Sequence, residues 1–199
     1  MSLLTVCRAL ALNAGLTIPD VVATSPDREW VEAMHMANEA GEEVARRVDW
    51  GVLLQSTTLA GDGSTQAFTL PDDFDRLPAG IALRAGTQII RPLTQAEWAG
   101  LVATAGFPRY FKLASNEVRL WPHPNTGTTV TVTYISREWL TGATAYAADA
   151  DEALIDETLI AKALIVRWRR QKGMPFADEE AEYEAALADR ARFDDRGRF

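Results

Sequence analysis

Apolar and small residues between positions 30 and 48 repeat with helical spacing. Alternating steps of four and three separate Trp30, Met34, Ala37, Gly41, Val44 and Val48. These steps place the residues on one stripe, the seam of a helix packed lengthwise against another helix. A glycine on that seam costs about 1 kcal/mol of helix propensity, so we expect another backbone to come close at Gly41. The pattern predicts a bundle helix that opens at Ser25-Pro26-Asp27, with a hydroxyl cap and a proline in the first turn.

A shorter helix is predicted ahead of it, over residues 3–13. Ser2 can cap its start, and Gly15 suits the left-handed conformation that commonly ends a helix. Its apolar face is formed by Leu3, Val6, Cys7 and Leu10.

A third bundle helix is predicted over residues 151–172. From Leu159 to Trp168 only Lys162 and Arg167 are charged. A helix that is apolar on nearly all sides must be covered on nearly all sides. We therefore expect the folded chain to cover one face and a neighbouring subunit to cover another. The residues expected to pack within the bundle or against that neighbour are Trp30, Met34, Gly41, Leu159, Leu164 and Trp168.

The C-terminal segment has a different composition. Gly173 ends the third helix, and a charged helix over about residues 177–191 follows, with Tyr183 and Leu187 as its main apolar positions. This helix is too polar for a core, so we expect it to be exposed until a partner arrives. Its tail mixes arginine with phenylalanine, as interface anchors do; a disordered terminus that orders on binding fits equally. The candidate docking residues are Tyr183, Leu187, Arg190, Arg192, Phe193, Arg196, Arg198 and Phe199.

Between residues 52 and 136 the pattern changes to short extended runs separated by turn signals. Three turns are expected at residues 60–64, 85–87 and 114–116, each the tip of a hairpin. The run 128–134 alternates with a period of two that buries Val130, Val132 and Tyr134. One short helix interrupts the strands, because Thr94 and Glu97 have the spacing of a capping box.

These elements predict an α+β protein that is mainly α. The expected architecture is a helical bundle with an inserted small antiparallel β module and an extended C-terminal helix and tail. The expected segments are bundle helices over 1–51, the β module over 52–136, a linker with the third helix over 137–173, and a docking helix and tail over 174–199.

Composition narrows the function. The formal net charge of −8 and the pI of about 4.8 describe a surface that repels nucleic acid, although an acidic lumen for passing DNA remains compatible with it. Cys7 is the single cysteine, which excludes a disulfide framework. No apolar run reaches the roughly 18 residues needed to span a bilayer, and the N-terminus lacks the pattern of a signal peptide. We expect synthesis in the cytoplasm and no membrane partner.

Candidate catalytic chemistry is sparse. His35 and His123 have no second histidine or cysteine at ligand spacing, so we predict no metal. The glycine-rich stretch 61–65 lacks the Gly-Lys-Ser/Thr ending of a phosphate loop. We predict no catalytic residue and no cofactor. Two alternatives stay open: a small nucleic-acid-binding or regulatory helical protein using residues 167–172, or an enzyme with a site around His123 and Asp72.

Several motifs, in this order along nearly the whole chain, resemble the head–tail connector (adaptor) proteins of tailed bacteriophages and gene transfer agents. The motifs are Leu70–Arg76, Asn116–Pro122, Tyr134–Arg137, Asp151–Glu157, Arg167–Gly173 and Tyr183–Leu187. The resemblance implies a helical bundle with a β insertion and no catalytic residues. It also implies a usually dodecameric ring beneath the portal that extends the DNA channel and joins head to tail.

The same resemblance implies the partners and the place of action. They are the portal protein, a downstream tail or stopper protein, further copies of the chain, and DNA only as it passes through non-specifically. The segment after Gly173 would grip the portal, the bundle helices would make ring contacts, and the β module would face outward or towards the tail. The location is the head–tail junction of a virion or phage-like particle.

Overall fold

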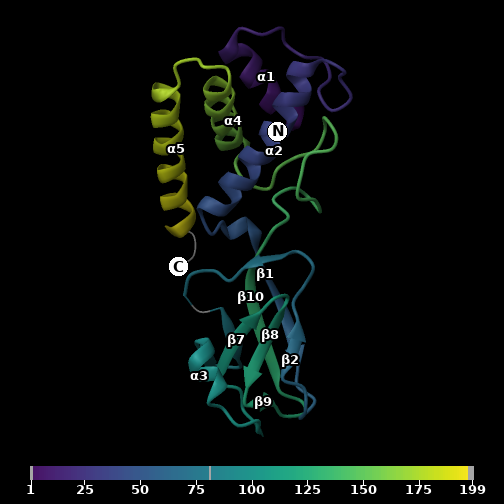
Figure 1. Cartoon of the computed structure of the whole chain (residues 1–199), viewed down its shortest axis with the longest axis vertical. Coiled ribbons are helices and arrows are strands. Elements are labelled where there is room, and N and C mark those ends of the chain that lie inside the picture. The colour runs from purple at the N-terminus through teal and green to yellow at the C-terminus, as the bar shows by residue number, and fades with distance from the viewer. Residues whose placement is uncertain (1, 81, 197–199) are drawn as a thin grey trace. The chain divides into compact units, whose positions relative to one another are not determined.

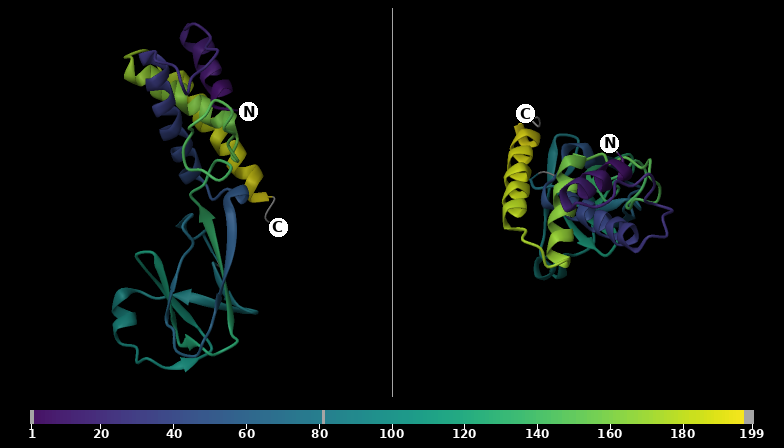
Figure 2. Two further views of the ribbon diagram at one scale, coloured as in Figure 1. Left: turned by 90° about the vertical axis from the view of Figure 1, so that its right-hand side faces the viewer. Right: turned by 90° about the horizontal axis from the view of Figure 1, so that it is seen from above.

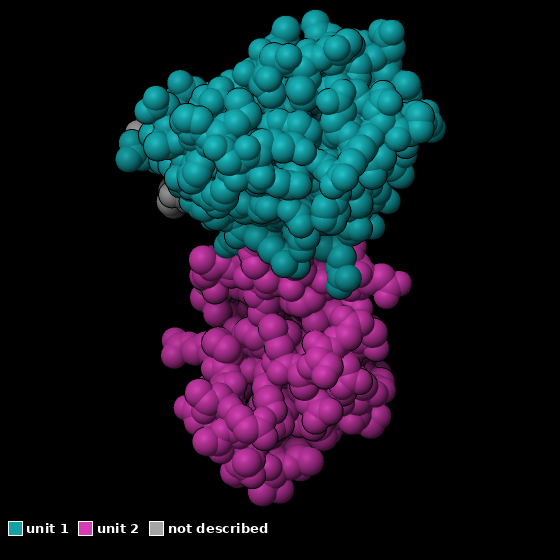
Figure 3. All heavy atoms as spheres, turned by 45° about the horizontal axis from the view of Figure 1, so that its top comes forward, with its two compact units in different colours: residues 1–53, 137–199 teal, residues 54–136 magenta. Residues whose placement is uncertain are grey.

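The computed structural model describes residues 2–80 and 82–196. Its contacts divide the chain into two compact units, which are coloured separately in Figure 3. The helical unit combines residues 1–53 with residues 137–199, and the β unit spans residues 54–136.

The helical unit is built around one central helix. Its helices are α1 (Leu3–Ala14), α2 (Arg28–Arg47), α4 (Glu157–Gln171) and α5 (Ala177–Arg196). Helix α4 packs against each of the other three, and α5 lies along it on the side away from α1 (Figures 1 and 2). The apolar surface of α4 is therefore covered within the chain, without the neighbouring subunit that the sequence pattern suggested. Its buried residues are Glu157, Leu159, Ile160, Ala161, Ala163, Leu164, Val166 and Trp168.

The helix ends agree with the sequence only in part. Gly15 ends α1 with a φ of 68°, the left-handed conformation expected. Ser2 stands at the N-cap position, but its side chain forms no capping hydrogen bond. The N-cap position of α2 is Asp27 rather than Ser25, and the Asp27 side chain forms no capping hydrogen bond. The Ser25 hydroxyl accepts a hydrogen bond from the Asp27 amide at 3.2 Å. Helix α4 starts at Glu157, later than predicted, because the Asp156 carboxylate caps it through the Thr158 amide.

The link over residues 137–156 completes the helical core. Trp139 and Tyr146 are both buried and pack edge to face, with ring centroids 5.0 Å apart. The Asp149 carboxylate accepts hydrogen bonds from the Val22 and Ala23 amides, both at 2.9 Å. These bonds tie the link to the segment between α1 and α2, so residues far apart in the chain form one core.

The β unit contains one large sheet. Its elements are β1 (Leu54–Ala60), β2 (Ala67–Thr69), β3 (Phe74–Arg76), β4 (Leu83–Ala85), β5 (Gln88–Pro92), α3 (Gln95–Ala99), β6 (Ala105–Gly106), β7 (Tyr110–Ala114), β8 (Glu117–Trp121), β9 (His123–Pro124) and β10 (Thr129–Ser136); a 3-10 turn, Gly51–Leu53, precedes β1. Seven strands pair in the order β1-β10-β4-β5-β7-β8-β2, and β3 also pairs with β10. This sheet curls into a nearly closed barrel-like form (Figure 2).

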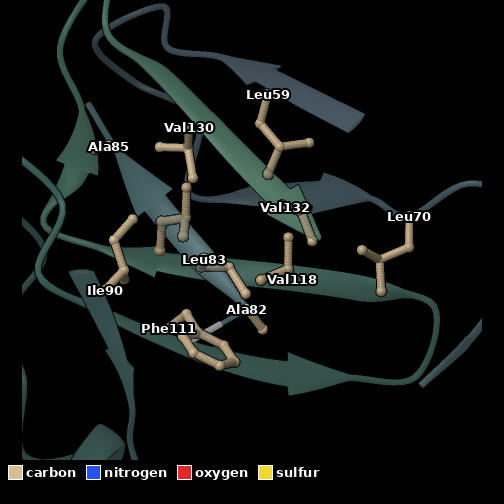
Figure 4. Packing of buried hydrophobic residues seen from close by; sticks show 11 residues of the cluster. Leu59, Leu70, Ala82, Leu83, Ala85, Ile90, Phe111, Val118, Val130 and Val132 are labelled. Carbon is tan, nitrogen blue, oxygen red and sulfur yellow. The ribbon is translucent and has the colours of Figure 1, made fainter. Parts of the chain in front are cut away.

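Alternate residues of these strands fill the inside of the barrel. Val130 and Val132 of β10 face Leu83 of β4 and Leu59 of β1, and Phe111 of β7 lies at the other side of the cluster (Figure 4). Val130 and Val132 are the inward residues that the period of two predicted.

The predicted fold class is wrong. Helices hold about 38% of the residues and strands about 25%, with a nearly closed sheet, so the chain is not a mainly helical bundle with a small insertion. The sheet is also not wholly antiparallel, because β5 pairs with β7 in parallel across the connection that carries α3. Strands of three residues such as β2, β3 and β4 are too short to show a clear period, which is why the sheet was underestimated.

The local turn predictions have mixed outcomes. The hairpins at 85–87 and 114–116 are confirmed by antiparallel pairing of β4 with β5 and of β7 with β8. The hairpin at 60–64 is wrong: β1 pairs with β10 and β2 with β8, so the segment connects the two ends of the sheet. The capping box of α3 is confirmed, with both reciprocal hydrogen bonds between Thr94 and Glu97.

Candidate functional site

The C-terminal helix is seated on its own unit. Gly173 has a φ of 67°, a conformation that glycine adopts without strain, and it turns the chain from α4 into the start of α5. Tyr183 and Leu187 are 4% and 5% exposed. The sequence predicted an exposed helix; instead its two apolar positions pack inside the chain.

Ion pairs hold the rest of α5. Arg47 of α2 pairs with Glu184 of α5 at 2.5 Å. Four more ion pairs join α5 to α4 and its N-cap residue Asp156. These further pairs are Lys162–Glu182 at 3.1 Å, Arg169–Glu179 at 2.9 Å, Arg170–Glu180 at 2.7 Å and Asp156–Arg190 at 3.3 Å. Exposed ion pairs contribute about 0–1 kcal/mol each and are screened by salt. The seat of α5 is therefore largely polar.

A cavity of about 430 Å³ lies where α5 meets α2 and α4, and charged side chains line much of it. Arg167 donates across it to Glu39 at 2.9 Å and to Glu43 at 2.6 Å. The Tyr183 hydroxyl lies 3.4 Å from Glu43. Burial, and then the nearby Glu43 carboxylate, raise the pKa of Tyr183, because both disfavour a phenolate. The contact of α5 with α2 and α4 is thus polar and bordered by an open groove.

The end of α5 carries the exposed docking candidates. Phe193 is 70% exposed, with the Arg190 guanidinium 5.5 Å from its ring centre, and Arg192 is also exposed. The Asp194 carboxylate accepts a hydrogen bond from the Gly51 amide at 2.8 Å. Arg196 is the last residue of α5, whereas Arg198 and Phe199 lie outside the described residues.

The residues expected to form bundle and ring contacts lie mainly in the core. Trp30, Leu159, Leu164 and Trp168 are buried within the helical unit, and Met34 is half-buried. Gly41 lies against the ring of Trp139, a side chain where the sequence suggested a backbone. Sequence reasoning missed Met36 and Trp139, both buried. Two aromatic residues, Trp139 and Tyr146, in an otherwise Ala- and Gly-rich link were the sequence signal that this link contributes to the core.

The basic segment 167–172 forms ion pairs within the helical unit. Arg167 bonds Glu39 and Glu43, and Lys172 pairs with Glu32 at 2.5 Å while its ammonium lies 4.5 Å from the ring centre of the buried Trp168. Two of the basic residues that would have bound nucleic acid, Arg167 and Lys172, are thus paired with acids of α2.

The residues named for an enzymatic site are placed separately. His123 lies in β9, which pairs with β6, and Asp72 lies in the turn before β3. Neither lines the cavity beneath α5. Among the described residues, no group of three or more histidine, cysteine, aspartate or glutamate side chains is arranged to hold a metal ion.

A comparison with protein families matches residues 1–198 to the family described as SU10 adaptor protein. The chain belongs to this family. It is a bacteriophage head–tail adaptor, a connector of virion assembly, and its partners lie at the head–tail junction. A structural family favours assembly over catalysis as its role. A comparison with curated proteins finds no match. Within the described part of the adaptor, no helix combines the length and apolarity that spanning a membrane requires.

Proposed function

We propose that this adaptor forms a ring, dodecameric by resemblance, beneath the portal, where it extends the DNA channel and joins the head to the next tail component. The match of an adaptor family to residues 1–198 carries the proposal. A structural connector needs surfaces for its neighbours rather than a reactive site, and the described residues offer such surfaces at the end of α5.

The portal contact is assigned to the C-terminal segment. Phe193 and Arg192 are exposed at the end of α5, and an aromatic beside arginines is the composition of interface anchors. Because Tyr183 and Leu187 are buried, they contribute to docking only if α5 leaves its seat. The polar contacts and the cavity under α5 lower the cost of that movement.

The experiment that tests the proposal is native mass spectrometry with negative-stain imaging of the adaptor alone and mixed with its cognate portal. A ring of adaptor seated on the portal supports the proposal, whether or not the isolated adaptor is a monomer. An adaptor that ignores the portal contradicts it. If the isolated chain binds duplex DNA with an affinity that falls steeply as salt rises, the nucleic-acid-binding alternative is favoured instead.

The docking assignment has its own variants. Phe193→Ala with Arg192→Glu should abolish portal binding without changing the melting temperature, because both side chains are exposed. Val102→Ala is the matched control, since Val102 is also an exposed apolar residue, at 79%. Portal binding by the Phe193 and Arg192 variant equal to that of the control would move the docking surface elsewhere.

A further inference from the structure

Charge is divided unevenly between the two units. The β unit contains six acidic and six basic residues, so the whole formal charge of −8 falls on the helical unit. Within the β unit the acids are used locally: Asp62 bonds the Ser64 and Thr65 amides, Asp73 bonds the Tyr134 hydroxyl, and Glu97 caps α3. Several bases of the β unit, by contrast, form no hydrogen bond or ion pair of this kind with another described residue.

These bases gather on the outer face of the sheet. In β4 and β8 every second residue is buried, whereas β5 buries only Ile90 and β7 only Phe111, so the residues next to these buried positions point outward. The outward residues, which we name the basic sheet face, include Arg84, Ile89, Arg91, Tyr110, Lys112 and Arg119. Strand pairing places Arg84 opposite Ile89, Arg91 opposite Tyr110, and Lys112 opposite Arg119.

Two features favour this face as a contact surface. Lys112 and Arg119 stand directly opposite each other, and like charges so placed on neighbouring strands destabilise a sheet. Each charge has one polar neighbour: the Lys112 ammonium donates a hydrogen bond to the Gln95 side chain, and Arg119 pairs with Glu117 at 3.6 Å. Among the described residues, the side chains of Arg84 and Arg91 form no ion pair or hydrogen bond. Like charges placed opposite each other break a local rule of sheet stability, and such a break is typical of a functional surface.

The helical unit offers the opposite surface. The segment from Leu12 to Val31, which we name the acidic link, carries the exposed apolar residues Leu12, Ile18, Val21 and Val31, between 41% and 71% exposed. Its acids are Asp20, Asp27 and Glu29, none paired within the described chain, whereas its Arg28 is bonded to Glu32 at 2.7 Å. It is therefore both apolar and negatively charged.

We propose that the basic sheet face of one subunit binds the acidic link of the next subunit, and that this contact is the repeating interface of the ring. The inference rests on the ring of the proposed function. The two surfaces differ, as a head-to-tail interface that closes into a ring requires. Their charges are opposite, which fixes how the two subunits align and disfavours wrong contacts. Each surface also has exposed apolar side chains, such as Ile89 on the sheet face and Val21 on the link, that the other surface would cover.

A second copy fits the basic sheet face better than DNA does. Binding to phosphates depends on many clustered bases, whereas this face has four, one of them beside Glu117, on a chain of net charge −8. DNA would also leave the apolar residues of the acidic link uncovered. A contact between copies accounts for both surfaces at once.

The test uses the full chain assembled on its portal, with the adaptor concentration that gives half-maximal ring formation as the readout. The face variant is Arg84→Glu with Arg91→Glu, and the link variant is Asp20→Lys with Glu29→Lys. Each alone should require at least about a tenfold higher concentration, because like charges then meet. An equal mixture of the two should assemble like wild type, since every interface in an alternating ring again joins opposite charges. Gln55→Glu with Ser56→Glu, which adds acids to exposed positions of β1, is the control that should assemble normally.

The outcomes separate the two proposals. If the wild-type chain forms no ring, the proposed function fails, and the inference with it. If the wild type forms rings and the face variant, folded by its melting temperature, forms them equally well, only the inference is overturned. Failure of the mixture to assemble, although both variants are folded, also overturns it, because the two surfaces are then not each other's partners. Loss of binding to a short DNA duplex by the face variant, with normal ring formation, would assign the face to DNA.

Discussion

The ring of Trp139 occupies the space where a side chain at Gly41 would begin. A Cβ built on Gly41 lies closer to three atoms of that ring than real Cβ atoms come to their neighbours. Trp139 is 1% exposed and belongs to the link that joins the β unit to α4, so one missing side chain on α2 lets this link reach the core.

Replacing Gly41 with alanine should destabilise the helical unit. The gain of about 1 kcal/mol in helix propensity is opposed by overpacking, which costs about 1–3 kcal/mol in a close-packed core. We expect a net loss in the free energy of unfolding, measured by urea denaturation, and a smaller loss in a Trp139→Phe background. Gly100→Ala is the control, because the nearest atom to a Cβ there is at an ordinary 3.7 Å. A stability unchanged by Gly41→Ala would show that the Trp139 ring moves without cost.

Trp168→Ala should cost about 3–5 kcal/mol of folding stability in the isolated chain, because the side chain is 3% exposed among the helices around α4. Chemical denaturation of the monomer measures it. Trp98→Ala in α3 should cost less, since that indole is only half-buried. A loss well under 1 kcal/mol together with failed ring assembly would instead place Trp168 at a subunit interface.

Helix α5 should detach from its seat before the unit unfolds. Leu187→Ala should increase hydrogen exchange over residues 177–196, because it removes a buried contact of α5. A rise in salt from about 0.1 M to 1 M should have the same effect, because it shortens the screening length of the ion pairs from about 10 Å to 3 Å. The amides of α4 should remain protected and serve as the internal reference. Equal loss of protection in α4 and α5 would mean that α5 unfolds only together with the whole unit.

Cys7 should make the adaptor less stable at high pH. Burial, and then the charge of Asp149, raise the pKa of the Cys7 thiol from 9.0 to about 12. Between pH 9 and 12 the unfolded chain releases the thiol proton while the folded chain keeps it, so this contribution to stability, complete below pH 9, is lost as the pH rises. The unfolding free energy of wild type should therefore fall more steeply over this range than that of Cys7→Ala. Parallel pH profiles of the two proteins would contradict the raised pKa.

Local sequence signals specified local structure well. The Thr94 and Glu97 capping box, the left-handed Gly15 and the inward Val130 and Val132 depend on neighbours within a few residues, and all three are confirmed. The stripe on α2 was less accurate, because Met36 is buried and Met34 is only half-buried. A helix that packs against α4 on one side and Trp139 on another buries a wider face than one seam.

Features set by distant residues could not be predicted in the same way. β1 pairs with β10, and nothing in residues 54–60 identifies a partner beyond residue 128. The seat of α5 depends on bases of α2 and α4 that meet its acids only after folding, so a charged helix looked exposed. The order of motifs along the chain, rather than any single element, predicted the adaptor family.

The division of the helical unit between the two ends of the chain has a consequence for its synthesis. Helices α1 and α2 find their main partner in α4, which begins only at Glu157, while the β unit is complete at residue 136. At translation rates of about 5–20 residues per second, the apolar faces of the first two helices wait on the order of 5–25 seconds after Leu53 before α4 has been made. The β unit can therefore fold on the ribosome first. The nascent N-terminal helices are the stretch that chaperones must shield, so a shortage of chaperones should reduce the yield of adaptor through these helices rather than through the sheet.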